Sequence, residues 1–560
     1  MVVIDTKFNL LQNLVGKKFT EKELVEILFD MGFELEEKVG DDIKIELTPE
    51  RSDCISTYGL ARAIRAYLGI KTGLPKYAVE RMISTCKVDS SLKQVLVPVN
   101  PEEKAPWQYV VCAVVKGLEF DDDRIKEVIR VQEKLHQTYL RKRRKGGIGI
   151  YPLDKIKLPI TFTAMAKDKI KFRPLEANKV MTGSEILMKH SAGREYSYLL
   201  EGNKNYPVFI DANTNILSMP PIINSHDTGK VDETTKDIFI ECTGVELEPL
   251  LVTLNILTTM FADMGGKVHG FDMLYSGKKI KTPDFTTRKR TINLEEIDQL
   301  LGIKFSAKDA KKLLEKMMHS ANLKGSKLEV ESPSFRVDMW HAVDIIDDIG
   351  RAYGYNNMKP RFPNVNTIGN IFPETKIKDD MADVLAGLGL VEIFTEALTN
   401  EDDQYSKMNT RSVPYIKIPH AVEPSLNMVR TWLTPCLFRS LNFNRSNRYP
   451  QEIFEIADVV IPDKKADVKS KNVTKLSMLI ADLTANFTRA KQVLQALSES
   501  MEVQLEVKAK DYDWFVSGRS GAITLNGKEV GYIGEFHPQV ILNWGLEVPV
   551  VGFEIDLSFL

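Results

Sequence analysis

A stretch of roughly 55 residues at the start of the chain recurs in its middle, and this internal repeat constrains the fold more than any other feature. GKKFTEKELVEILFDM in the first copy aligns with GIKFSAKDAKKLLEKM in the second without a gap. In the first copy, Thr20 and Glu23 have the spacing of a capping box, which marks the start of a helix. Ser306 and Asp309 give a shortened version of this signal in the second copy. Apolar residues at helical spacing follow in both copies, so each predicts a helix.

The similarity continues through a strand, a turn and a second helix. KIELTPERSDCISTYGLARAIRAYLGI aligns with KLEVESPSFRVDMWHAVDIIDDIGRAYGY after one residue is inserted behind the proline. This alignment places Arg51 on Arg336. It also places Asp53 on Asp338. We therefore predict two related helix-strand-helix modules.

The chain between and after these modules mixes strands with helices. WQYVVCAVV, YPVFI and DIFIECTG alternate as strands do, whereas residues 123–142 and 247–264 have apolar residues at helical spacing. An N-G pair within AITLNGKEVGYIGEF predicts a hairpin turn. With 560 residues the chain is too long for a single core. We predict a multidomain α+β fold with four domains, at residues 1–85, 86–275, 276–362 and 363–560.

Composition excludes several classes of protein. The chain has 75 Lys and Arg against 77 Asp and Glu, so it has no overall basic field for non-specific binding of nucleic acid. Its five cysteines are scattered and never in C-x-x-C spacing, which argues against a disulfide framework or a thiolate zinc site. No apolar run approaches the roughly 18 residues that span a bilayer. We expect a cytoplasmic protein with reduced thiols and no membrane partner.

Four aspartates lie close together in the second module: Asp338, Asp344, Asp347 and Asp348. The last three share one helix face at spacings i, i+3 and i+4, where like charges repel. The first module has glycine, arginine and alanine at those three positions, so packing does not require the acids. Two interpretations stay open. The oxygens suit a magnesium ion, or the acids favour a helix N-terminus while Arg351 pairs with Asp347.

Five consecutive cations lie at the end of the predicted helix 123–142: Arg141, Lys142, Arg143, Arg144 and Lys145. They can neutralise the C-terminus of that helix before the Gly146-Gly147 stop. They can also form a patch for RNA phosphates, or a localisation signal. The sequence leaves these interpretations open.

Two further segments suggest a pocket in the middle domain. LSMPPIINS is apolar but has consecutive prolines, which predicts a rigid, partly buried loop. In DIFIECTGV, Glu241 and Thr243 lie on the same side of a strand. They either line a ligand pocket beside the loop, or Glu241 is exposed and Thr243 makes a turn. The chain has no H-E-x-x-H or G-x-S-x-G motif to support protease or α/β-hydrolase chemistry.

Taken together, these motifs resemble those of phenylalanyl-tRNA synthetase β subunits of the shorter archaeal and eukaryotic cytosolic type. The resemblance rests on TPERSDCIS, LSMPPIINS, IFIECTG, PSFRVDMWHAVDIIDDIGRAYGYNN and SGRSGAITLNGKEVGYIGEFHPQVI, and it covers essentially the whole chain. It implies that Asp338, Asp344, Asp347 and Asp348 bind magnesium at a subunit interface. The chain departs from the family pattern with Asp at 347 and 348, where Glu is common.

The resemblance also implies that residues 86–275 form an editing domain, which hydrolyses tyrosine attached by mistake to phenylalanine tRNA. The matching editing residues are Ser218, Glu241 and Thr243; many archaeal relatives have Asp in place of this Glu. We expect Glu241 to accept the tyrosine hydroxyl proton while the other two position substrate or water. Editing is needed because a pocket for a phenyl ring rejects an added hydroxyl only about a hundredfold.

The C-terminal domain resembles a class II synthetase catalytic fold, an antiparallel sheet, without its catalytic groups. VPVVGFEIDL carries Glu554 and Asp556 but no arginine to neutralise the phosphates of ATP. We therefore expect no catalytic residue for aminoacylation here and no adenylate formation by this chain alone. The resemblance implies an α2β2 complex in which ATP is used on the α subunit and phenylalanine tRNA is the substrate. The alternative is a stand-alone tRNA-binding quality-control protein.

Overall fold

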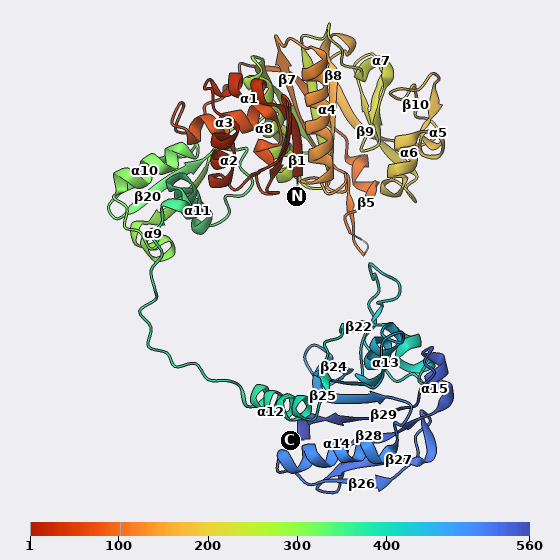
Figure 1. Ribbon diagram of the computed structural model, residues 1–560. Helices are drawn as coiled ribbons and strands as arrows, with labels where there is room; N and C mark the ends of the chain where they lie inside the picture. The colour runs from red at the N-terminus through yellow and green to blue at the C-terminus, as the bar shows by residue number, and fades with distance from the viewer. Residues whose placement is uncertain (1, 101, 560) are drawn as a thin grey trace. The chain divides into compact units, whose positions relative to one another are not determined.

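The computed structural model describes residues 2–100 and 102–559. The chain divides into two compact units, one ending at Phe362 and the other beginning at Pro363 (Figure 1). Both units combine helices with β-sheets, so the predicted α+β class and multidomain organisation are confirmed.

The first module is a three-stranded antiparallel sheet with order β1-β3-β2 and three helices. The predicted capping box is present at the start of its second helix. The Glu23 N–H donates to Thr20 Oγ1 at 3.2 Å, and the Thr20 N–H donates to Glu23 Oε2 at 2.6 Å. Its elements are β1 (Val2–Lys7), α1 (Phe8–Val15), α2 (Glu21–Asp30), β2 (Glu34–Val39), β3 (Asp42–Leu47) and α3 (Thr57–Tyr67).

The second module repeats this arrangement, with strand order β18-β20-β19. The Asp309 N–H donates to Ser306 Oγ at 3.1 Å, so the shortened capping signal also marks a helix start. Each module begins with a strand and a short helix that precede the predicted helix. The elements are β18 (Arg288–Asn293), α9 (Leu294–Leu301), α10 (Ala307–Lys316), β19 (Ser320–Lys324), β20 (Lys327–Ser332) and α11 (Ala342–Tyr353).

The middle of the first unit is a ten-stranded mixed sheet with order β14-β13-β12-β9-β4-β16-β7-β15-β8, and β17 pairs with β16. Helices α4 (Asp122–Gln137) and α8 (Leu247–Asp263) pack on one face of its β7-β15-β8 part. The opposite face belongs to a second core. The strands are β4 (Met82–Val88), β7 (Tyr109–Lys116), β8 (Gly146–Pro152), β9 (Ile160–Ala166), β12 (Asn205–Ile210), β13 (Ile216–Met219), β14 (Ile223–Asn224), β15 (Ile238–Gly244), β16 (Lys267–Tyr275) and β17 (Lys278–Thr282).

Shorter elements complete this region. These shorter elements are β5 (Leu96–Pro98), β6 (Lys104–Pro106), β10 (Lys171–Phe172), β11 (Met181–Thr182), α5 (Gly183–Lys189), α6 (Ser191–Tyr196) and α7 (His226–Gly229). Tyr196 of α6 is buried in the second core, and α7 begins directly after the LSMPPIINS segment.

The C-terminal unit is a seven-stranded sheet with order β21-β24-β25-β29-β28-β27-β26, antiparallel except for the β21-β24 pair. Helices α12 (Pro373–Gly387) and α14 (Phe487–Ser500) pack on one face, and α13 (Thr434–Phe443) and α15 (Pro538–Asn543) on the other. The predicted N-G hairpin joins β27 to β28. The strands of this sheet are β21 (Val391–Glu392), β24 (Gln451–Pro462), β25 (Ser470–Ala481), β26 (Leu505–Ala509), β27 (Phe515–Leu525), β28 (Lys528–Phe536) and β29 (Val550–Asp556). A separate two-stranded sheet pairs β22 (Leu398–Thr399) with β23 (Met428–Val429).

All five cysteines are buried and carry free thiols. Within residues 2–100 and 102–559, no helix is long and apolar enough to cross a membrane.

Candidate functional site

Strand β15 holds two polar side chains inside the middle domain. Glu241 and Thr243 are separated by one residue, so both side chains leave the same face of the strand. On the neighbouring strand β8, the residues opposite them are Gly149 and Gly147. A Cβ atom at Gly149 would lie 2.4 Å from Glu241 Oε1, so glycine is needed to leave room for the carboxyl group.

The LSMPPIINS segment closes over this part of the sheet. A Cβ atom at Gly147 would lie only 3.1 Å from Pro221 Cβ, which shows how closely the loop approaches β8. The Tyr151 hydroxyl, also on β8, lies 3.1 Å from Glu241 Oε1 and 3.3 Å from Asn224 Oδ1. Burial and the Glu241 carboxylate raise the pKa of Tyr151. The structure therefore brings the three predicted residues together.

Each of these three residues has a buried polar atom without a hydrogen-bond partner among the described residues. The atoms are Ser218 Oγ, Glu241 Oε2 and Thr243 Oγ1. A buried unsatisfied polar group costs about 1–3 kcal/mol, so folded proteins contain few of them. These three atoms are therefore available to accept or donate hydrogen bonds to a polar ligand or to water.

The alternative in which Glu241 is exposed and Thr243 makes a turn is wrong. Only 1% of Glu241 is exposed, and both residues lie within β15. Burial raises the pKa of Glu241 to about 8, although the hydrogen bond from Tyr151 lowers it. At pH 7 this carboxyl group is therefore mostly neutral, and it can both donate and accept a hydrogen bond.

Sequence reasoning missed Tyr151 and Asn224 as parts of this site. A signal for Tyr151 was present, because G-x-G-x-Y in GGIGIYP places both glycines and the tyrosine on one strand face. Asn224 had no such signal: its contact with Tyr151 joins residues 73 positions apart.

Each of the four predicted metal ligands already forms hydrogen bonds or ion pairs with other groups of the protein. Arg336 binds Asp338 through two parallel bonds, Nε to Oδ1 at 2.8 Å and Nη2 to Oδ2 at 2.7 Å. Asp348 Oδ2 lies 2.9 Å from Arg336 Nη2 and 2.7 Å from His319 Nε2. The first module repeats this fork between Arg51 and Asp53, so the R-x-D motif is a structural feature of both copies.

The remaining two acids serve helix α11. Asp344 Oδ2 accepts the N–H groups of Trp340 and His341 at 2.7 and 2.6 Å, which caps the helix. The predicted pair between Asp347 and Arg351 is confirmed, with Nε 2.7 Å from Oδ2. Among the described residues, no group of three or more His, Cys, Asp or Glu is placed to hold a metal ion. As arranged here, the four acids do not fit a magnesium ion, and the magnesium site stays a prediction.

The basic run lies beyond the helix that was expected to contain its start. Helix α4 ends at Gln137, and Arg141, Lys142 and Arg143 follow with positive φ angles of 49°, 53° and 63°. The expectation that the run neutralises the last turn of this helix is therefore wrong. Arg143 binds other parts of the middle domain, Arg144 lies over the Tyr198 ring, and Lys145 lies 3.5 Å from Glu246. The proposed contact of the run with RNA is untested.

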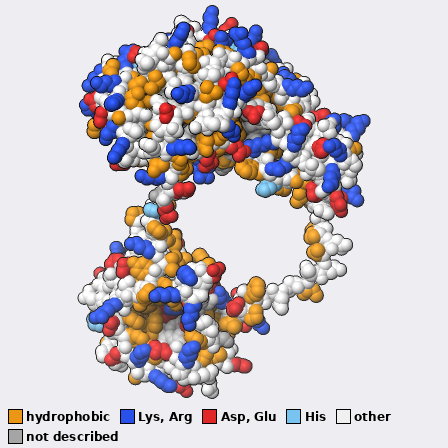
Figure 2. All heavy atoms as spheres, turned by 180° about the vertical axis from the view of Figure 1, so that it is seen from behind, with side chains coloured by type: hydrophobic (Ala, Val, Ile, Leu, Met, Phe, Trp, Pro, Cys, Tyr) orange, Lys and Arg blue, Asp and Glu red, His pale blue; other side chains and the backbone are white. Residues whose placement is uncertain are grey.

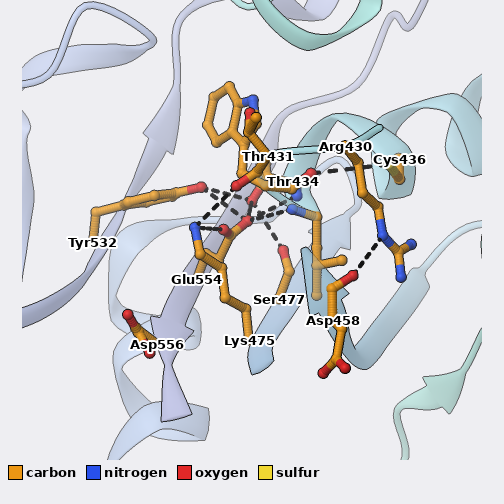
Figure 3. A network of polar contacts seen from close by, with 12 residues as sticks. Arg430, Thr431, Thr434, Cys436, Asp458, Lys475, Ser477, Tyr532, Glu554 and Asp556 are labelled. Carbon is orange, nitrogen blue, oxygen red and sulfur yellow. Dashed lines mark hydrogen bonds and ion pairs between the residues drawn. The ribbon is translucent and has the colours of Figure 1, made fainter. Parts of the chain in front are cut away.

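A second buried polar network lies in the C-terminal unit around Glu554 on β29. Glu554 Oε1 accepts from Lys475 Nζ at 2.8 Å, and Oε2 accepts from the N–H groups of Leu433 and Thr434 at 3.0 and 2.9 Å. The hydroxyls of Thr434 and Tyr532 complete the set at 2.8 and 3.1 Å. Figure 3 shows these groups around the carboxylate, whereas Asp556 stands apart. Glu554 thus caps helix α13, a role that its sequence position did not reveal.

Comparisons with known proteins cover almost the whole chain. The family described as "Phenylalanyl tRNA synthetase beta chain CLM domain" matches residues 358–557, and "tRNA synthetase B5 domain" matches residues 290–355. The "Phenylalanine--tRNA ligase beta subunit" of Pyrococcus horikoshii is 38% identical over 552 residues, covering 98% of this chain and 97% of that protein. The protein of the same name from Archaeoglobus fulgidus is 35% identical over 561 residues, covering 100% of this chain and 98% of that protein.

A solved structure also matches the first part of the chain. It is an N-terminal fragment of the phenylalanyl-tRNA synthetase beta subunit from Pyrococcus horikoshii, with 37% identity and a TM-score of 0.59. The match covers 63% of this chain and 99% of the fragment.

Proposed function

The chain belongs to the family of phenylalanine--tRNA ligase beta subunits, and from this premise we propose a division of labour with an alpha subunit. The alpha subunit uses ATP to attach phenylalanine to its tRNA. This chain supports that reaction, and its middle domain removes tyrosine that has been attached in error. We expect the complex to work in the cytoplasm.

The observation that carries the editing proposal is the set of three unsatisfied atoms beside Gly147 and Gly149. Glu241 accepts the hydroxyl hydrogen of a bound tyrosine, which phenylalanine cannot offer. A buried site built for a hydroxyl discriminates strongly against the analogue that lacks it. Ser218 and Thr243 have free hydroxyls with which to orient the ester or the attacking water. Water adds to the ester carbonyl, the bond to the ribose oxygen breaks, and that oxygen takes a proton.

The editing site is tested with phenylalanine tRNA charged with tyrosine. Glu241→Ala should clear this tRNA about 10- to 100-fold more slowly than the parent, because the tyrosine hydroxyl loses its partner. Glu233→Ala removes an exposed glutamate from the same domain and serves as the matched control. Deacylation by Glu241→Ala at the parental rate would refute the proposed role.

The proposed partnership draws support from exposed apolar side chains of the C-terminal unit. Phe394 and Phe443 are 91% and 89% exposed, and Leu388 and Val391 line a groove of about 580 Å³. Figure 2 shows hydrophobic side chains gathered on this unit. Exposed apolar patches commonly mark protein interfaces. We propose that the alpha subunit covers this surface in an α2β2 complex.

The C-terminal unit is proposed to be an inactive class II catalytic fold. Its largely antiparallel sheet suits that class, but β29 presents Glu554, already bound to Lys475, and no arginine. A negative carboxylate at this place opposes the binding of phosphate groups. This chain alone should therefore form no phenylalanyl adenylate.

Charging of phenylalanine tRNA tests the whole assignment. This chain alone, an alpha subunit alone and their mixture are each supplied with ATP, magnesium and phenylalanine, and only the mixture should charge. Charging by this chain alone would refute the inactive C-terminal fold. No charging by the mixture, with an alpha subunit shown to work with another beta subunit, would favour a stand-alone tRNA quality-control protein.

A further inference from the structure

A small cavity opens in the C-terminal unit beside the buried network of Glu554. Its volume is about 230 Å³, below the range of most drug-sized binding sites, so it suits one ring system with a short polar group. Lys475 belongs to both features, because it lines the cavity and also binds Glu554. Figure 3 shows Lys475 and Thr431, two residues of the cavity wall, within this network. The cavity takes no part in the reactions proposed above.

Three aromatic side chains line the cavity: Tyr405, Trp432 and Trp514. The ring centroids of the two tryptophans lie 5.4 Å apart with 63° between the ring planes, so the rings form a corner. The indole N–H of Trp432 donates to the carbonyl oxygen of Gln404 at 2.9 Å. The Tyr405 hydroxyl lies 2.6 Å from the Thr431 hydroxyl. Because these bonds hold the rings in place, the walls favour a flat aromatic ligand.

Two polar groups of the cavity have hydrogen-bond donors to spare. Trp514 Nε1 is buried and has no partner among residues 2–100 and 102–559. The Lys475 ammonium lies 2.8 Å from Glu554 Oε1 and 3.5 Å from the Thr431 carbonyl oxygen, and these contacts use two of its three N–H donors. The spare groups can only donate, so a ligand that satisfies them must carry hydrogen-bond acceptors.

The wall of the cavity has an excess of positive charge. Lys475 and Arg411 line it, and among the described residues no Asp or Glu does. Glu554 neutralises Lys475, so the exposed Arg411 guanidinium supplies the excess charge. Aromatic rings can also surround a cation, but two positive side chains oppose this. The wall therefore selects an anionic ligand.

We propose that this cavity binds a small aromatic anion, a single ring system that carries a carboxylate. The ring packs against Tyr405, Trp432 and Trp514. The carboxylate accepts hydrogen bonds from the Trp514 N–H and from Lys475, and its charge is balanced by Arg411. This site goes beyond the proposed ligase and editing functions, because it lies in the C-terminal unit and needs neither ATP nor tRNA.

Three probes that share a phenyl ring and differ in charge test the proposal. Hydrocinnamate is an anion, hydrocinnamamide is neutral and phenylpropylamine is a cation. Each is titrated into the full chain by isothermal calorimetry. We expect hydrocinnamate to bind with a Kd below about 1 mM and about 3- to 10-fold more tightly than the amide. The amine should give no measurable binding.

Three variants locate the bound probe. Val413 lies at the cavity and is 51% exposed, so Val413→Trp fills the space from outside the core and should abolish binding. Trp514→Phe keeps a ring but loses the N–H, and it should weaken hydrocinnamate about 3- to 10-fold. Arg411→Gln should weaken hydrocinnamate about 2- to 5-fold and leave the amide unchanged. Arg448→Gln removes an exposed arginine that does not line the cavity and should match the parent.

Several results would contradict the proposed site. They are no binding of hydrocinnamate to the parent, parental binding by Val413→Trp, equal affinity for acid and amide, or tightest binding of the amine. Thermal unfolding verifies that each variant folds, and the exposed positions 411 and 413 test the proposal if Trp514→Phe does not fold. If the full chain needs an alpha subunit to fold, the complex is titrated, and the heat lost in Val413→Trp isolates this cavity. Failure of the ligase or editing proposals leaves these outcomes unchanged.

Discussion

The middle domain and the C-terminal unit each bury a glutamate within a β-sheet, and the two differ in how completely their oxygens are satisfied. Glu554 receives five hydrogen bonds from protein groups, one of them from Lys475. Glu241 receives one, from Tyr151, and its Oε2 has no partner among the described residues. A buried acid with every oxygen bound stabilises the fold. A buried acid with a free oxygen can still bind a polar ligand.

Removing the satisfied acid should give the largest effect. Glu554→Ala leaves the Lys475 ammonium without its carboxylate and takes the cap from helix α13, so the free energy of unfolding should fall by about 3–5 kcal/mol. Urea denaturation followed by tryptophan fluorescence measures this change, because three of the five tryptophans, Trp432, Trp514 and Trp544, lie in the C-terminal unit. A loss below about 1 kcal/mol would show that the network around Glu554 is not what holds this sheet together.

The stability of the strand that holds Glu241, the acid with a free oxygen, should depend on pH. Because the pKa of Glu241 is raised to about 8, the folded protein keeps a proton that the unfolded chain releases near pH 4.5. Its stabilising contribution is full below about pH 4.5 and is lost as the pH rises through about 8. Between pH 5.5 and 8.5 the parent should lose about 3 kcal/mol of local stability relative to Glu241→Gln, which does not titrate there. Hydrogen exchange of β15 in the two proteins, compared at each pH, measures the difference. Equal losses in both would contradict the raised pKa.

Each glutamate accepts a hydrogen bond from one tyrosine hydroxyl, and removing that hydroxyl should give the smallest effect of the three tests. It compares the two acids directly, because the same change is made beside each. Tyr532→Phe removes one of several donors to Glu554 and should cost about 1 kcal/mol of stability. Tyr151→Phe removes the hydrogen bond that lowers the pKa of Glu241, so the pH at which β15 loses protection should rise. Denaturation of the first variant and the pH titration of the second are the measurements. The contrast between the two acids would fail if Tyr151→Phe left that pH unchanged.

Local patterns in the sequence were sufficient for much of the fold. The capping residues Thr20 and Ser306 marked real helix starts, and the N-G pair marked a real hairpin. Strand alternation correctly placed Glu241 and Thr243 on one face. These features depend on residues a few positions apart, which a single sequence displays directly.

Long-range partners could not be predicted in the same way. The helix predicted at residues 123–142 ends at Gln137 in the structure, and the chain then turns to bring Arg143 to Pro221. The hydrogen bonds from Arg336 and His319 to Asp348 join residues 12 and 29 positions apart, and nothing in the sequence indicated them. Ser218 entered the candidate site through resemblance alone. Such contacts are set by tertiary packing.

The five buried cysteines can report which part of the chain unfolds locally, because a buried thiol reacts with reagents only after the structure around it opens. Cys54 lies in the first module, Cys436 lies in the C-terminal unit, and the middle domain contains the other three: Cys86, Cys112 and Cys242. Burial raises the pKa of the Cys436 thiol to about 12, so it reacts slowly with alkylating reagents until its surroundings open. Identifying by mass which thiol is labelled first would therefore give the order in which the parts of the chain unfold, without any engineered probe.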